Sequence, residues 1–224
     1  MSHIRKQSIG YHVVLALVLC PSGLRAQLPL HALDASFGAS SNTSRFSLTG
    51  LHRVSVVHGS AWVGVGLRAT AYAAKTAEFT NRGTVQGVLT ATTPIAATVY
   101  GLNLMLEGDL QLTSSVSLGA NLDIVGVATG PTRSLGLVGA KPNGVSLFEY
   151  GSRDRGSLNS EFYVSVALNQ AIHFRLGASH YVLGYDVTDQ VSAGPGIPAS
   201  SRYQRFATVP FVALSIPLFG HEHR

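Results

Sequence analysis

Strict alternation of apolar and polar residues runs through this 224-residue chain and constrains its fold more than any other feature. In the clearest segment, residues 102–112, one register consists of Leu102, Leu104, Leu106, Leu110 and Leu112. The other register carries Asn103, Met105, Glu107, Asp109 and Gln111. Successive side chains of a strand point to opposite faces, so a period of two predicts strands with one apolar and one polar face.

The same period recurs often enough to predict eight strands. The other seven are expected at residues 30–37, 45–57, 63–72, 117–124, 161–168, 172–179 and 203–219. In the last of these, Pro210 and Pro217 remove two ladder donors, so that strand should be irregular. After the first connection, short turns alternate with long loops, and the long loops are expected over 76–98, 129–157 and 184–202.

The composition of the chain is unusual for a protein that is surrounded by water. Charged residues make up 12% of the chain and the mean hydropathy is +0.24, whereas about 25% charge is typical of soluble domains. This balance excludes a disordered chain, and scattered basic residues argue against a nucleic-acid partner. A chain this apolar is not expected to face water on every side.

Residues 1–26 have the layout of a secretory signal peptide. Arg5 and Lys6 precede an apolar run over 13–20, Pro21 breaks it, and Ala26 offers a small residue before the cut. The mature chain, 27–224, is then expected to be one barrel domain. Its formal net charge falls from +5 to +2, because the leader holds three basic residues and no acid. The basic excess is therefore no argument for an acidic partner.

Short turns at one end and long loops at the other are typical of outer-membrane barrels. With the leader, the alternating strands and a near-terminal Phe219, the chain resembles the small eight-stranded outer-membrane β-barrels, the OmpA transmembrane-domain and OmpX-like family. The resemblance implies an all-β, eight-stranded antiparallel up-and-down transmembrane β-barrel. It also implies a monomer in the outer membrane of a Gram-negative-type bacterium, reached after secretion across the inner membrane, with membrane lipid as its partner.

The polar register collects charges that are expected to lie inside the barrel. An eight-stranded barrel is just wide enough to be filled by side chains, and buried charges are costly unless paired. A packed network of ion pairs is favoured over a solute or proton path. Its expected members are Asp34, Arg53, Arg68, Glu107, Asp109, Asp123, Glu161, His173 and Arg175.

Any binding is expected on the long loops, because rigid scaffolds commonly carry function there. A structural or surface-interaction role follows, although the same residues also fit ordinary solvated loop charges. The candidate contacts, all in 129–157, are Arg133, Lys141, Phe148, Tyr150, Arg153 and Arg155.

Aromatic residues near the strand ends fit either interfacial girdles or ordinary strand aromatics. On the long-loop side these are Phe37, Phe79, Tyr100, Tyr163, Tyr181, Tyr185, Tyr203 and Phe206. Trp62 and Phe219 lie on the short-turn side.

Catalytic and metal motifs are weak, so no enzyme, cofactor or metal site is expected. The carboxylates Glu107, Asp109 and Asp123 are already accounted for as members of the expected ion-pair network in the lumen. Ser179 and His180 are adjacent strand residues and should point to opposite faces. His221 and His223 alone make a weak metal site.

A rival interpretation keeps the strands and swaps their faces. A soluble, secreted or periplasmic lipocalin-like barrel would line a cavity for a small apolar ligand with the same leucines. Alternation does not separate the two possibilities. The direction in which the face of Leu102–Leu112 points does.

Overall fold

The computed structural model describes residues 30–57, 59–81, 92–135, 138–148, 157–187 and 202–218. The expected signal peptide, Phe219 and the His221–His223 tail lie outside these ranges, as do the loop candidates Tyr150, Arg153 and Arg155. Within them, no helix is long and apolar enough to cross a membrane.

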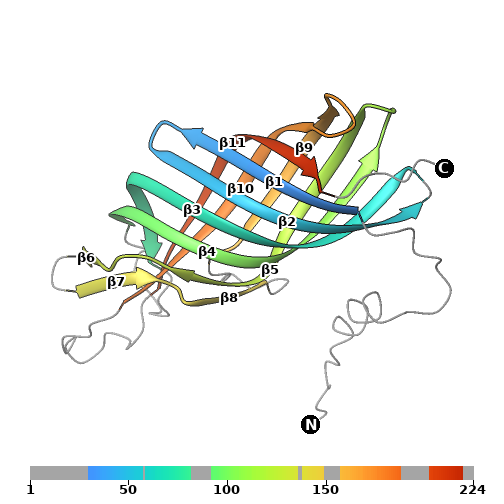
Figure 1. Cartoon of the computed structure of the whole chain (residues 1–224). Helices are drawn as coiled ribbons and strands as arrows, with labels where there is room; N and C mark the ends of the chain where they lie inside the picture. The colour runs from blue at the N-terminus through green and yellow to red at the C-terminus, as the bar shows by residue number, and fades with distance from the viewer. Residues whose placement is uncertain are drawn as a thin grey trace, which may run out of the picture.

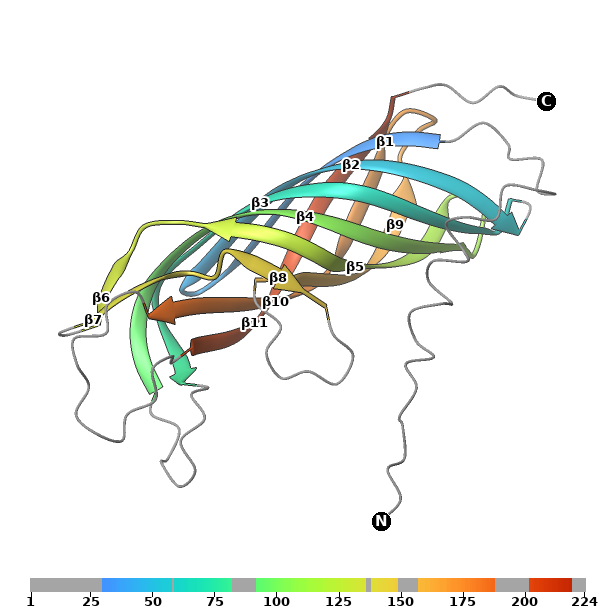
Figure 2. The same cartoon turned by 90° about the horizontal axis from the view of Figure 1, so that it is seen from below.

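Eight strands close into an antiparallel up-and-down barrel, which confirms the predicted fold class (Figures 1 and 2). Neighbours in sequence pair around the ring, and β11 pairs with β1 to close it. The ring strands are β1 (Leu30–Ser40), β2 (Thr43–Val57), β3 (Ala61–Asn81), β4 (Thr92–Gln111), β5 (Val116–Thr129), β9 (Asn159–Ala167), β10 (His173–Val187) and β11 (Arg202–Pro217).

The turns between these strands differ in length at the two ends of the barrel. At one end the connections after β2, β4 and β9 are short, and Gly59 adopts φ 69° in the first of them. Glycine reaches this left-handed region without a Cβ penalty. At the other end, β1 and β2 join through the tight turn at Ser41–Asn42, while the remaining connections are longer.

The expected loop over 76–98 is wrong at both ends, because β3 and β4 extend well into it. They are 21 and 20 residues long, and 82–91 alone separates them. A register shift between Ala74 and Ala77 interrupts the pairing of β3 with β4. This bulge changes which sequence parity faces inward, and it hides the continued strand from a search for strict alternation.

The segment 129–157 is also not a free loop. It contains β6 (Arg133–Leu135), β7 (Val138–Pro142) and β8 (Val145–Leu147). The ring strand β9 begins only at Asn159. Toward the long-loop end from there, β5 and β10 have no residues of β9 to pair with. β8 pairs with 125–127 of β5, and β7 pairs with 185–187 of β10. The two short strands thus complete the wall between β5 and β10.

The barrel changes its cross-section above the β1–β2 turn. There β3 pairs directly with β11, through Thr80 with Gln204 and Asn81 with Tyr203. In Figure 1, β3 and β4 continue past the β1–β2 hairpin toward β6 and β7. The ring without β1 and β2 forms an extension at the long-loop end.

Candidate functional site: the lipid-facing wall and the lumen

The leucine register of β4 points outward. Leu102 and Leu110 are 51% and 50% exposed, whereas Asn103 and Met105 between them are fully buried. Equivalent side chains continue around the ring as Leu33, Leu48, Val65, Leu67, Leu118, Val164, Leu176, Val212, Leu214 and Ile216, all more than a third exposed. An apolar surface of this extent is not that of a water-soluble monomer.

The height of this apolar belt fits a bilayer. Along β4 and the residue after it, the belt runs from Tyr100 to Leu112, which spans about 28 Å at roughly 3.3 Å per residue and a 45° tilt. Closure of the ring pairs the backbone groups that hydrocarbon cannot hydrate. A closed ring of strands with an apolar outer face defines a transmembrane β-barrel.

The aromatic residues divide between the two faces, so some fit an interfacial girdle and the others are inward-facing strand residues. Phe37, Tyr100 and Phe206 are about half exposed on the outer face, and Phe46, which was not anticipated, joins them. Tyr163, Tyr181, Tyr185 and Phe79 are buried. Trp62 lines a cavity at the short-turn end. The parity of Trp62, Tyr163, Tyr181 and Tyr185 assigns them to the inner register, and the bulge in β3 turns Phe79 inward. These five residues are therefore not interfacial anchors.

Inside the barrel, one charged cluster lies toward the short-turn end. Arg53 binds Glu107 with two hydrogen bonds, Nε to Oε2 at 2.6 Å and Nη2 to Oε1 at 2.8 Å. Arg175 Nη1 lies 2.5 Å from Asp34 Oδ2 and 3.2 Å from Glu107 Oε1. The Tyr163 hydroxyl donates to Glu107 at 2.5 Å, and the Arg175 guanidinium lies 4.6 Å from the Tyr163 ring centroid. Glu107 therefore joins two arginines and a phenol.

A second charged cluster lies next to the first, toward the long-loop end. Glu161 contacts Arg45 Nη1 at 2.5 Å and Arg68 Nη2 at 3.1 Å, and it accepts a 2.6 Å hydrogen bond from Asn121. Arg68 Nη1 also lies 3.1 Å from Asp123. Glu161 is the centre of this cluster, because each of its two carboxylate oxygens contacts an arginine side chain.

Neutral amides complete the second cluster. Asn103 donates to Asp123 at 2.6 Å, and Asn159 donates to Glu161 through its side chain and to Asp123 through its backbone N–H. Ser179 donates to Asn159 at 2.6 Å. Charge-assisted bonds of this kind are about twice as strong as neutral ones, and they offset part of the cost of burial.

The charges in the two clusters balance. Four arginines face four carboxylates, all at most 9% exposed: Arg45, Arg53, Arg68 and Arg175 with Asp34, Glu107, Asp123 and Glu161. No lysine is among them. The planar guanidinium presents five donors in a fixed fork, which lets one residue serve several acceptors. We name these eight residues the charged layer.

The structure brings seven of the nine expected lumenal residues into the charged layer. The other two, Asp109 and His173, line the cavity at the short-turn end, where Asp109 is hydrogen-bonded to Ser117. Sequence reasoning missed Arg45. It lies eight positions before Arg53 on one continuous strand, so its parity alone assigns it to the inner face.

Glycines on the inner register provide space for Tyr163. A Cβ at Gly119 would collide with the Tyr163 ring, and one at Gly177 would collide with the Phe162 carbonyl and the Tyr163 backbone. The phenol reaches Glu107 because both neighbours lack a side chain. These glycines are needed for packing between neighbouring strands.

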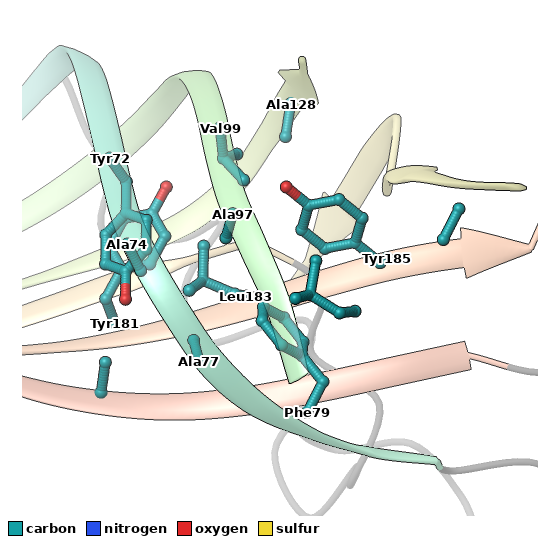
Figure 3. Close-up of a cluster of buried hydrophobic side chains, with 13 residues drawn as sticks. Tyr72, Ala74, Ala77, Phe79, Ala97, Val99, Ala128, Tyr181, Leu183 and Tyr185 are labelled. Carbon is teal, nitrogen blue, oxygen red and sulfur yellow. The ribbon is translucent and has the colours of Figure 1, made fainter. Parts of the chain in front are cut away.

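The extension is filled by an apolar cluster, shown in Figure 3. Tyr72 stacks on Tyr181 with ring centroids 5.3 Å apart, and Phe79 meets Tyr185 edge-on at the same distance. The Tyr185 hydroxyl donates to the Thr98 carbonyl at 3.2 Å and accepts from the Thr98 N–H at 3.1 Å. Burial raises the pKa of the Tyr185 phenol, so it stays a donor. We name this cluster (Tyr72, Ala74, Ala77, Phe79, Ile95, Ala97, Val99, Ala128, Ala140, Tyr181, Leu183, Tyr185 and Ala207) the apolar layer.

The described loop candidates are close to the wall. Arg133 donates to Thr98 Oγ1 at 2.9 Å, and Phe148 is partly buried, with its N–H bonded to Ile124. Lys141 is exposed on β7. Arg133 and Phe148 thus contact the barrel itself.

The weak catalytic and metal motifs do not assemble into a site. Ser179 is buried in the lumen and His180 is exposed outside, where it bonds Thr208. Glu107 and Asp123 are paired with arginines. Over the described ranges, no three His, Cys, Asp or Glu side chains gather as metal ligands would.

No family model and no curated protein sequence matches the chain. Several solved structures do match, and these include two that align over most of the chain. The Yersinia pestis outer membrane protein Ail, solved in a phospholipid bilayer nanodisc, is 12% identical with a TM-score of 0.38, over 84% of this chain and 98% of its own. The CymD monoaromatic hydrocarbon channel is 10% identical with a TM-score of 0.20, over 87% of this chain and 89% of its own. With values this low, the class of the chain rests on its own closed ring and outer surface.

Proposed function

We propose that the protein is an integral outer-membrane β-barrel with a closed lumen and a structural or surface-interaction role. The observation that carries this proposal is the opposition of the two faces of each ring strand. Apolar side chains face outward over a bilayer-sized belt, and balanced ion pairs face inward. In the outer membrane, the barrel has its short turns in the periplasm, and the extension projects from the cell.

The contents of the lumen argue against a solute path. The charged layer links Arg45, Arg68 and Glu161 across strands β2, β3 and β9, and the apolar layer lies beyond it. A water-filled route would have to break ion pairs and then cross packed aromatic rings. Both steps are costly in free energy.

The lipocalin-like alternative requires the leucine register to line an internal cavity. Leu102 and Leu110 point the other way, and the cavity at the short-turn end is lined mainly by serines, amides and charged groups. These observations favour the membrane barrel.

Fractionation and conductance test the proposal together. The mature chain should stay in the membrane fraction after carbonate washing and show heat-modifiable gel mobility after detergent extraction. In planar bilayers it should give little or no steady conductance. A carbonate-soluble chain would refute the membrane assignment, and a large stable ohmic current would refute the closed lumen.

The surface-interaction role rests on the loop candidates Tyr150, Arg153 and Arg155, which lie outside the described residues. Deleting 132–155 would remove β6, β7 and β8, so alanine substitution of Tyr150, Arg153 and Arg155 is the gentler test. We expect the triple variant to keep heat-modifiable mobility while cells that express it lose any attachment that the parent barrel confers. Attachment equal to that of the parent would remove these residues from the proposal. Thr132→Ala, at an exposed position of the same segment that is not a candidate contact, is the control.

A further inference from the structure

The lumen is not filled at its short-turn end. A cavity of about 620 Å³ opens there, with Arg53 and Arg175 among the residues that line it. Eight-stranded barrels are narrow enough for side chains to fill completely, and this barrel does so in its charged and apolar layers. The unfilled end therefore calls for a separate explanation.

The cavity exists because several strands change from large to small inward residues. On β9, Glu161 and Tyr163 are followed by Ser165 and Ala167. On β11, Phe211 is followed by Ala213 and Ser215. Ser117 of β5 and Ala32 of β1 line the same space. Larger residues at these positions would close it, as they do farther up the same strands.

The lining combines one indole with many neutral hydrogen-bonding groups. Trp62, the sole tryptophan of the chain, is half-buried at the wall. Around the rim stand amides and hydroxyls, among them Gln111, Asn169 and Gln170. Amides and hydroxyls both donate and accept hydrogen bonds, while an aromatic ring offers an apolar face with a polar edge.

The electrostatics of the cavity disfavour an anionic ligand. Arg53 is already bound to Glu107, and Arg175 to Asp34 and Glu107. The partly exposed carboxylate of Asp109 adds negative charge to the lining. A phosphate or carboxylate would therefore find occupied guanidinium groups and a like charge. A neutral ligand rich in hydroxyls meets no such cost.

We infer that this cavity binds an uncharged saccharide of one or two rings, stacked on Trp62 and hydrogen-bonded to the surrounding serines and amides. That it opens toward the periplasm rests on the proposed function, whereas the cavity and its lining do not. The surrounding ring of strands makes the site rigid, and a preorganised site loses little free energy in ordering itself.

Trp62 provides a direct reading of the site, because no other tryptophan contributes emission. In the full chain folded in detergent micelles, N,N′-diacetylchitobiose should change the emission saturably, with a dissociation constant of about 1 mM or tighter. It should also lower the acrylamide quenching constant. Inorganic phosphate at the same concentrations should do neither.

Two substitutions at adjacent positions provide the matched control. Ala167 lines the cavity, whereas Val166 points outward from the same strand. Ala167→Phe should fill the cavity and lose the response to the disaccharide. Val166→Phe should keep it, and both should retain heat-modifiable mobility. If Ala167→Phe does not fold, Ala167→Leu serves the same purpose with a smaller side chain.

The outcomes separate this inference from the proposed function. Acrylamide quenching without any response to the disaccharide would mean a hydrated cavity only and would overturn the inference. So would protection by phosphate, or an unchanged response in the cavity-filled variant. Quenching of Trp62 by brominated lipid and not by acrylamide would place this residue in the lipid. That result would overturn the assignment of the inner and outer faces of the barrel, on which the proposed function rests.

Discussion

The charged layer and the apolar layer occupy the same lumen a few residues apart, yet one is built from ion pairs and the other from aromatic and aliphatic side chains. Strand β3 crosses both. In the first, Arg68 points inward while Leu67 faces out; in the second, Phe79 points inward while Glu78 faces out. Along its length the strand therefore changes which of its faces is apolar, from the outer face in the charged layer to the inner face in the apolar layer. The medium outside the wall, lipid below and water above, decides which face must be apolar.

This comparison assigns different costs to the same kind of change in the two layers. In the lipid belt, polarity belongs inside and the core is held by paired charges. In the extension, the core obeys the rules of a soluble domain, where cavities and lost apolar contacts set the cost.

Removing Glu161 should damage the charged layer most. Glu161→Ala leaves Arg45 and Arg68 without their shared carboxylate, and breaking a buried ion pair costs about 3–5 kcal/mol. Urea unfolding in lipid vesicles or micelles would measure the loss. Glu161→Gln keeps the shape and one acceptor oxygen, but its amide nitrogen would face donors, so it should recover only part of the loss. A change within experimental error would mean that the pairs are not sites of stabilisation.

An arginine on the outer face should discriminate the two media. Leu106→Arg places a charge in the apolar belt, where such substitutions cost about 2–4 kcal/mol near the bilayer midplane. Ala96→Arg places the same charge on the outer surface of the extension and should hardly change the free energy of unfolding. The difference between the two in vesicle refolding measures the change of medium along β4. Equal costs would contradict the inversion.

Overpacking at a glycine should give a smaller loss. Gly119→Ala pushes a methyl group against the Tyr163 ring, and inserted methyl groups cost about 1–3 kcal/mol in packed interiors. Gly108, which has open space around it on the outer face, supplies the control: Gly108→Ala should cost nothing measurable. The free energies of unfolding of both variants decide the point.

A single methylene gives the finest test. Ile95 is buried in the apolar layer, and Ile95→Val should cost about 0.5–1.5 kcal/mol. Ile216 is 43% exposed on the lipid-facing wall, where acyl chains replace the lost contacts, so Ile216→Val should cost less. A reversed order in the two unfolding free energies would show that the extension is not packed as a soluble core.

Much of this architecture follows from local pattern, and the exceptions have physical causes. Period-two alternation located the ring strands, and parity put Arg53, Arg68 and Glu107 on one face. The bulge after Ala74 concealed the upper half of β3, because one extra residue reverses the parity that the pattern depends on. β6, β7 and β8 were missed for another reason: strands of three to five residues are too short for a periodic signal.

Sequence alone determined the alternating faces, their charge content and the asymmetry of the two ends, because these depend on neighbours along the chain. It did not decide which face is outside, since an apolar register fits lipid and an internal cavity equally well. The outward direction of the leucine register, seen at Leu102 and Leu110, settled that choice. Tertiary structure also decided the partners: Arg45 meets Glu161, 116 positions away, only because the ring brings β2 and β9 to face each other across a narrow lumen.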